Sequence, residues 1–227
     1  MAAKPHRRWY QFSLRTLLVS FTVLAIVSAI TGYFVHIWND GEEGRRMQRM
    51  NDLILNNGGY WEVGESVDMG NATATQLDTV LAELSTFDNQ IGMSFVGSEF
   101  GDAHVKHLLG HHGLKRISLD NTLITDDGLR ELTSLDGIEG LSLQDVAITD
   151  AGLEHLTKLK HLEWLILDGD TVTDKGLEQL AKIPSLNHVR LKGTKVTQQG
   201  ITELKRALPA IEVNKYYGSP NKYEFYP

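Results

Sequence analysis

Hydrophobic residues recur with a 24-residue period along the C-terminal half of the chain. Each period opens with a triplet whose first and third residues are apolar, and these triplets begin at Ile117, Leu141, Leu165 and Val189. The middle residue is polar in three of them and is Ile166 in the other. Alternation with a period of two predicts a short strand with one buried face. A second apolar stripe follows in each period with a spacing of three, as at Leu129, Leu132 and Leu135, and this spacing predicts a helix.

A polar pair stands between each predicted strand and its helix. Thr125-Asp126, Thr149-Asp150 and Thr173-Asp174 each offer a hydroxyl that can cap the helix and an acid at its positively polarised start. We interpret the aspartates as helix-start residues rather than as a catalytic or calcium-binding line. The strand and helix of a single 24-residue unit cannot bury their apolar faces alone, so the units are expected to stack into a solenoid.

These residues resemble the leucine-rich repeat family. The pattern L-x-x-L-x-L-x-x-T-x-I/V-T-D-x-G-L is matched from Leu162 to Leu177, with Asp170 in place of the first threonine. The resemblance covers residues 93–212 and, more weakly, residues 60–92. It implies an α/β fold, namely a right-handed solenoid with one short strand and one helix per 24-residue unit. It implies little about function, because one fold serves many activities.

A transmembrane helix is predicted before the repeats. Residues 16–35 carry no charge and span about 30 Å at 1.5 Å per residue, which matches a bilayer core. Basic residues precede the run and acidic residues follow it, so we expect the N-terminus inside the cytoplasmic membrane and the repeats on the extracytoplasmic side. A cleaved signal peptide is the alternative, with a cleavage site at Val27-Ser28-Ala29, but the length of the run favours an uncleaved anchor. The whole arrangement resembles bacterial single-pass, membrane-anchored leucine-rich-repeat proteins.

The chain is expected to divide into five segments. These are a cytoplasmic basic N-terminus (1–15), the transmembrane helix (16–38), a juxtamembrane helix and N-terminal cap (39–68), the repeats (69–213) and an aromatic C-terminal cap or tail (214–227). In the third segment, a charged helix from Glu42 to Asn56 ends at Gly58-Gly59, and a short strand follows at 60–63. The aromatic residues of the last segment are expected to cover the final repeat, while a flexible tail that captures a partner is the alternative.

Composition and charge exclude several function classes. The net charge is −7, and residues 1–16 alone carry +4, so the remainder carries −11 and is poorly suited to nucleic acid. The chain has no cysteine, which excludes disulfides, thiolate zinc sites and iron–sulfur clusters. No G-x-S-x-G, Walker A, G-x-G-x-x-G or H-E-x-x-H motif occurs, so we expect neither an enzyme nor a cofactor.

A histidine cluster supports an alternative function. On a helix, His104, His107 and His111 would share one face, followed by His112, and imidazole is a common zinc ligand. The cluster His104–His112 could therefore serve a metal- or ligand-responsive envelope sensor. No carboxylate accompanies it on that face and Gly110 should end the helix, so we interpret it as a half-exposed cluster and predict no metal site.

The solvent-facing strand positions carry the leading functional hypothesis. On two adjoining predicted strands they form one group, which comprises Trp164, Ile166, Asp168, His188, Arg190 and Lys192. Aromatic and arginine side chains together are typical of protein-binding hot spots, and solenoids commonly bind through their concave face. We therefore predict that these residues bind a protein partner. The alternative is that Trp164 packs against His188 and Arg190 and binds nothing.

Overall fold

The computed structural model describes residues 42–62, 66–84, 91–169 and 171–214. The chain divides into two compact units, Met1–Arg49 and Met50–Pro227. Of the first unit, the described part is the beginning of helix α2. The second unit contains all the described strands and the remaining described helices.

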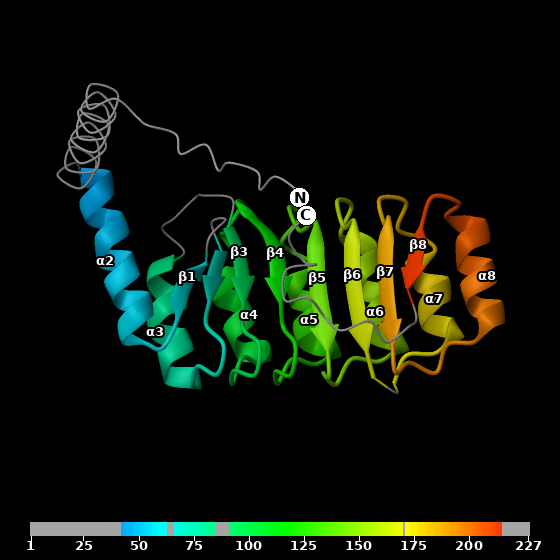
Figure 1. Cartoon of the computed structure of the whole chain (residues 1–227), viewed down its shortest axis with the longest axis horizontal. Coiled ribbons are helices and arrows are strands. Elements are labelled where there is room, and N and C mark those ends of the chain that lie inside the picture. Colours follow the sequence, from blue (N-terminus) through cyan, green and yellow to red (C-terminus); the bar gives the residue numbers. More distant parts are fainter. Residues whose placement is uncertain (1–41, 63–65, 85–90, 170, 215–227) are drawn as a thin grey trace, which may run out of the picture. The chain divides into compact units, whose positions relative to one another are not determined.

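Strands and helices alternate along the second unit (Figure 1). The strands are β1 (Tyr60–Glu62), β2 (Ser66–Asp68), β3 (Ile91–Ser94), β4 (Leu114–Ser118), β5 (Gly140–Gln144), β6 (Trp164–Asp168), β7 (His188–Lys192) and β8 (Glu212–Asn214). The helices are α2 (Glu42–Asn56), α3 (Ala74–Leu84), α4 (Asp102–Leu108), α5 (Asp126–Leu132), α6 (Asp150–His155), α7 (Asp174–Leu180) and α8 (Gln198–Ala207), with a 3₁₀ turn η1 at Leu156–Lys158.

All eight strands form one sheet in sequence order. Strands β2 to β8 are parallel, and β1 closes one edge by pairing antiparallel with β2. The register places Leu141 beside Ile117 and Leu165, so residues one period apart are direct neighbours in space. This confirms the predicted strands and the stacking of the 24-residue units.

The predicted helix before the repeats is confirmed with the same bounds, Glu42–Asn56. It ends where the backbone N–H of Gly59 donates to the Ile54 carbonyl at 2.9 Å and Gly58 adopts a left-handed φ of 82°. Glycine is favoured in this conformation because it has no Cβ to collide with the carbonyl. The two glycines therefore act as the helix stop that the sequence predicts.

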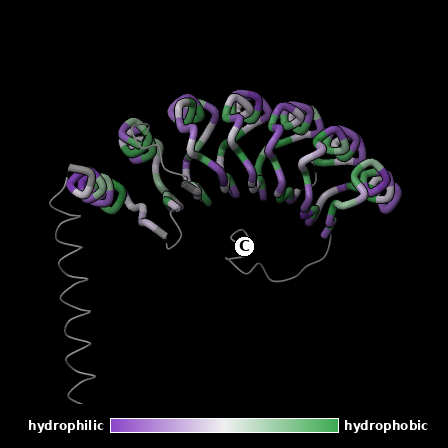
Figure 2. The backbone as a smooth tube through the Cα atoms, turned by 90° about the horizontal axis from the view of Figure 1, so that it is seen from above, coloured by the Kyte–Doolittle hydropathy of each residue, from purple (hydrophilic) through white to green (hydrophobic). Residues whose placement is uncertain are grey.

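Within the second unit, the strands line the inner side of an arc and the helices lie on its outer side (Figure 2). The apolar columns fill the layer between them, and Ile117, Leu141 and Leu165 are all but inaccessible to solvent. The residue between each pair of core positions, which is polar on most strands, faces the inner, concave side. The repeat pattern therefore builds a continuous core and a separate solvent-facing strand surface.

A column of left-handed residues follows the strands. Its members recur with the 24-residue period, their φ angles lie between 52° and 122°, and they are Gly97, Asn121, Asp145, Gly169 and Gly193. Only glycine, asparagine and aspartate adopt this conformation readily, which explains why no other residue type occurs in the column. The next position carries Ser98 and Thr122, whose hydroxyls donate to the carbonyls of Phe95 and Leu119 at 2.7 Å.

The threonines before the helices act as the predicted caps, but the aspartates do more than mark the helix start. Asp150 accepts from the backbone N–H of Thr173 at 2.8 Å and from its hydroxyl at 2.6 Å. The same pair of bonds joins three further aspartate–threonine pairs, namely Asp102 with Thr125, Asp126 with Thr149, and Asp174 with Thr197. Each aspartate therefore ties its own repeat to the cap of the next one.

We expect Asp150→Asn to lower the free energy of unfolding by about 1–2 kcal/mol, because hydrogen bonds to charged groups are worth more than a helix-end charge. Asp127→Asn is the matched control, since Asp127 also lies in the first turn of a helix but pairs with Arg130 of the same helix. That control should change stability by about 0.5 kcal/mol or less. Urea unfolding of the full chain in detergent measures both, and equal losses would mean that the inter-repeat bonds contribute nothing.

The predicted termini lie outside the described residues. This applies to the basic N-terminus and the transmembrane helix (residues 1–38) and to the aromatic tail from residue 215 onward. None of the helices within residues 42–62, 66–84, 91–169 and 171–214 has the length and apolar character that crossing a membrane requires.

Candidate functional site

The six residues predicted to bind a partner lie together on the concave face. Strands β6 and β7 pair so that Trp164 neighbours His188, Ile166 neighbours Arg190, and Asp168 neighbours Lys192. All six side chains are half-buried, whereas the residues between them on each strand are buried in the core. The alternation of each strand therefore brings the six residues onto one surface of two adjoining strands.

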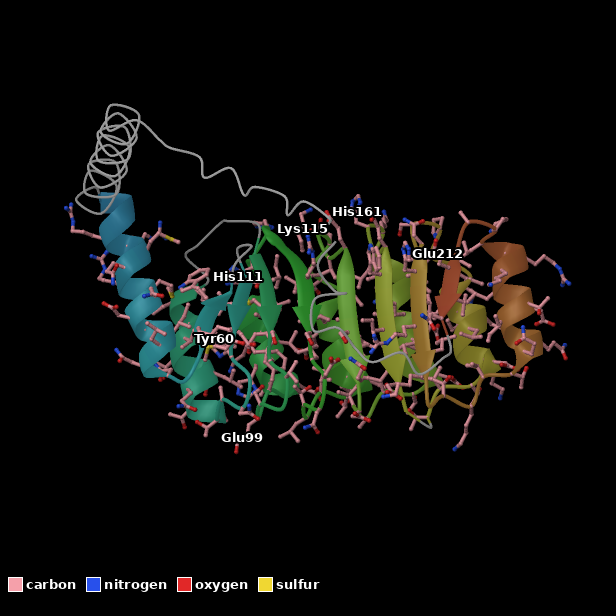
Figure 3. All side chains as sticks on the ribbon, in the orientation of Figure 1. Tyr60, Glu99, His111, Lys115, His161 and Glu212 are labelled. Atoms are coloured by element: carbon pink, nitrogen blue, oxygen red, sulfur yellow. The ribbon has the colours of Figure 1, made fainter. Side chains whose placement is uncertain are left out.

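The two aromatic rings of this surface are stacked. The ring centroids of Trp164 and His188 lie 3.7 Å apart, and the ring planes differ by 4°. On its other side, His188 Nε2 lies 3.1 Å from Oε2 of Glu212, which Figure 3 labels on β8. Trp164 thus packs against His188, as the alternative interpretation of the sequence expected. The stack also holds the indole in one orientation on the surface.

The charged residues of this surface hold one another in position. Lys192 Nζ lies 3.5 Å from Asp168 Oδ2. Arg190 donates to Gln144 Oε1 at 2.9 Å, and the side-chain amide of Gln144 donates to Asp120 Oδ2 at 2.8 Å. Asp120 also accepts from the hydroxyl of Ser142 at 2.5 Å. A chain of polar contacts therefore runs from Arg190 on β7 to Gln144 on β5 and on to Asp120, which follows β4.

Asp120 and Gln144 belong to this surface although the sequence does not single them out. They lie one repeat apart and precede Asp168 and Lys192 in the same solvent-facing column, which is the signal that could have identified them. Their contribution is to position Arg190 rather than to add an exposed group. Side chains that already occupy one conformation lose less entropy when a partner binds, so the arrangement suits binding.

Within the histidine cluster, His104 forms a hydrogen bond at the start of helix α4. His104 is 7% exposed, and its Nδ1 accepts from the backbone N–H of Gly101 at 2.9 Å. In the later repeats, the corresponding N–H belongs to a threonine and donates to the aspartate of the preceding repeat. At the start of α4, His104 therefore accepts the hydrogen bond that an aspartate accepts in the later repeats. This role explains why a histidine occupies the position that Gly128 and Gly152 occupy in the next two repeats.

This hydrogen bond determines which ring nitrogen of His104 carries the proton. A neutral imidazole has one acceptor nitrogen, so Nε2 carries the hydrogen while Nδ1 accepts. Nε2 of His104 lies 4.0 Å from Oδ1 of Asp78 on α3, and Nε2 of His107 lies 3.3 Å from the same oxygen. Within the described parts of the chain, no three histidine, aspartate or glutamate side chains are placed to hold a metal ion.

The expectation that the helix ends before His111 is confirmed, so His111 does not share a helical face with His104 and His107. Helix α4 ends at Leu108, two residues before Gly110, and the carbonyl of Leu108 accepts from the N–H groups of Gly110 and His111. His111 therefore lies in the turn before β4, where it is buried (Figure 3). The sequence places no carboxylate on that face of the helix, and the one that lies beside His107 comes from another helix, as Asp78 of α3.

Known proteins offer similarity at the level of three-dimensional structure. Internalin C2 from Listeria monocytogenes str. 4b F2365 is 19% identical over 68% of this chain and 74% of its own, with a TM-score of 0.49. Internalin F from the same strain is 14% identical over 74% of this chain and 64% of its own, with a TM-score of 0.37. No protein-family model and no curated protein sequence matches the chain. The 24-residue units and the parallel pairing of β2 to β8 themselves show that residues 66–84, 91–169 and 171–214 form an α/β solenoid with the architecture of leucine-rich repeats.

Proposed function

We propose that this chain is a non-catalytic binding module that receives a protein partner on the concave face of β6 and β7. The observation that carries this proposal is the pair of large apolar side chains, Trp164 and Ile166, at solvent-facing positions of one strand. Most such positions on the preceding strands carry glycine, serine or a charged residue. Two apolar groups surrounded by ordered polar side chains have the composition of an interface centre and its rim.

The polar surroundings support the same function. Arg190 stands at the centre of the surface and is held by Gln144, while Lys192 and His188 have carboxylate neighbours. Arginine and tryptophan are the residue types that most often dominate binding energy in protein interfaces. The surface is preorganised, so a partner would gain contacts without first ordering these side chains.

We further propose that the module is anchored in the cytoplasmic membrane by residues 16–38, with the N-terminus inside and the repeats on the extracytoplasmic side. This location rests on the sequence, namely on the uncharged run of residues 16–35 and on the basic residues that precede it. These residues lie outside the described ones. A partner would then be a protein of the cell envelope or of its surroundings.

Crosslinking in intact cells tests binding and location together. A membrane-impermeant amine crosslinker should capture a partner of the wild-type chain, and the double variant Trp164→Ala/Arg190→Ala should reduce that capture. Truncation of one hot-spot residue costs about 2 kcal/mol, or about 30-fold in affinity. Arg130→Ala is the matched control, because Arg130 is an exposed arginine on helix α5 that pairs with Asp127 of its own helix.

The outcomes separate the two parts of the proposal. Capture that depends on Trp164 and Arg190 but requires a membrane-permeant reagent would contradict the location and keep the binding surface. Equal capture by the wild type, the double variant and Arg130→Ala would show that the partner binds elsewhere on the chain.

A further inference from the structure

The stack of Trp164 and His188 is closer and flatter than two neutral aromatic rings prefer. Its ring centroids lie 3.7 Å apart and its ring planes differ by 4°, whereas the uncharged pair Phe95 and Phe100 in the core is tilted by 33° at 4.5 Å. Neutral rings favour offset or tilted arrangements, because their electron-rich faces repel each other. A cation, in contrast, is attracted to the face of an indole. The geometry of the stack therefore suits a charged imidazole better than a neutral one.

A carboxylate contacts the same imidazole from the neighbouring strand. Nε2 of His188 lies 3.1 Å from Oε2 of Glu212 on β8. Because Nε2 faces this oxygen, it carries a hydrogen in both forms of the ring. The contact is then a hydrogen bond when the ring is neutral and an ion pair when the ring is charged, and a hydrogen bond between two charged groups is the stronger of the two. Both contacts of the ring therefore strengthen when it gains a proton.

The other surroundings of His188 do not cancel this preference. Nδ1 is buried and has no hydrogen-bond partner within the described part of the chain. It would be an unpartnered acceptor in the neutral ring and an unpartnered donor in the charged ring, so it favours neither form. The other charged residues of β6, β7 and β8 are Asp168, Arg190 and Lys192. Lys192 pairs with Asp168, and Gln144 of β5 holds the guanidinium of Arg190 on the far side of β6 from His188.

We propose that the concave face responds to protons: when His188 gains a proton, it holds Trp164 more firmly in position, and the face binds its protein partner more tightly. The response of the stack rests on the contacts above, whereas its effect on binding rests on the proposed function. Imidazole is the side chain that ordinarily changes charge between about pH 5 and pH 8. The contacts of the charged ring are present at the acidic end of this range and are lost as the pH rises. A cation over an exposed indole is worth about a 2–5-fold change in an equilibrium constant, so we expect affinity to fall by that factor toward pH 8.

Tryptophan fluorescence tests the stack without any partner. A charged imidazole in contact with an indole quenches its emission, so the emission of Trp164 should fall when the full chain in detergent is taken from about pH 8 to about pH 5.5. The chain has four tryptophans, and subtraction of the Trp164→Phe spectrum isolates this one. His188→Gln should abolish the fall. Glu212→Gln should reduce it, because the amide keeps an acceptor oxygen but carries no charge.

His161→Gln is the matched control, because His161 is an exposed histidine in the turn before β6 (Figure 3). It should leave the fall in emission intact. Equal Trp164 emission at both pH values in the wild type would overturn the proposal, and so would a fall that persists in His188→Gln. Circular dichroism at both pH values verifies that each variant is folded.

Photo-crosslinking measures the effect on binding, since its chemistry does not depend on pH. A benzophenone amino acid replaces Ser118, which lies on β4 in the same row of the concave face as Ile166. Isolated membranes that contain the full chain are illuminated at each pH, with the partner below saturation. Capture should be about 2–5-fold greater at about pH 5.5 than at about pH 8, and His188→Gln should remove the difference.

The results distinguish this inference from the proposed function. Equal capture at both pH values, while Trp164→Ala/Arg190→Ala still abolishes it, would reject the regulation and keep the binding site. Capture that is insensitive to this double variant at both pH values would reject the binding site and, with it, the effect of protons on binding. The fluorescence measurement then decides whether the stack itself responds to protons.

Discussion

Replacement of Gly176 by alanine should lower the free energy of unfolding by about 2–3 kcal/mol, although alanine is the better helix former. A Cβ at this position would lie 2.6 Å from Oδ1 of Asp150 and 2.8 Å from Cδ1 of Leu153. The carboxylate could move away only by giving up its bonds to Thr173, and hydrogen bonds to a charged group contribute about 1.5–3 kcal/mol each. A gain of about 1 kcal/mol in helix propensity offsets part of that loss.

Gly110→Ala is the matched control for this substitution. Among the described residues, no heavy atom lies within 4 Å of a Cβ built at Gly110, and the residue is exposed. Its replacement should leave stability unchanged or raise it by up to about 1 kcal/mol, because the unfolded chain loses freedom. Urea unfolding of the full chain, followed by circular dichroism, measures both variants. A stability of Gly176→Ala equal to that of the control would show that the carboxylate accommodates a Cβ without losing Thr173.

Leu156→Ala should have the largest effect, with a loss of about 2–5 kcal/mol. Leu156 opens the 3₁₀ turn η1 that extends helix α6, and its exposed fraction is 0%. It lies in the continuous core between the sheet and the helices, where the neighbouring repeats on both sides prevent the cavity from closing. The loss therefore combines the transfer of the side chain with the cost of an empty space.

Leu123→Ala removes the same atoms from a residue that is 66% exposed, in the loop before helix α5. It should change stability by about 0.5 kcal/mol or less, since surface substitutions rarely exceed that value. Both variants are compared in the same urea titration. Similar midpoints for the two leucine substitutions would contradict the assignment of Leu156 to the core.

The periodic part of the fold could be predicted from the sequence because the same pattern of apolar and polar residues occurs in each repeat. Period-two alternation identified the strands, and the threonine before each helix was identified as its cap. The end of helix α2 could also be predicted, because the glycine pair Gly58-Gly59 alone determines it. These features depend on neighbours in sequence, and four copies of them exclude chance.

The contacts between repeats could not be predicted in the same way. Asp150 and Thr173 are 23 residues apart and meet only because the strands pair in register, so the aspartate looked like a helix-start charge alone. The role of His104 could not be predicted either, but for a different reason. Its ring nitrogen accepts from the Gly101 N–H within the same repeat, where the later repeats use an aspartate of the preceding repeat. The link from Arg190 through Gln144 to Asp120 likewise depends on the order of strands in space.

The bonds between each aspartate and the next threonine also determine how such a chain can change its length. Both partners come from the same two positions of every unit, so a unit that carries them can follow any other. Duplication or deletion of one whole unit within the gene leaves every interior aspartate with a threonine partner. An insertion or deletion of another length would leave one aspartate without its threonine. Recombination between repeats can therefore add strands to the concave face, or remove them from it, while the contact between neighbouring units stays the same.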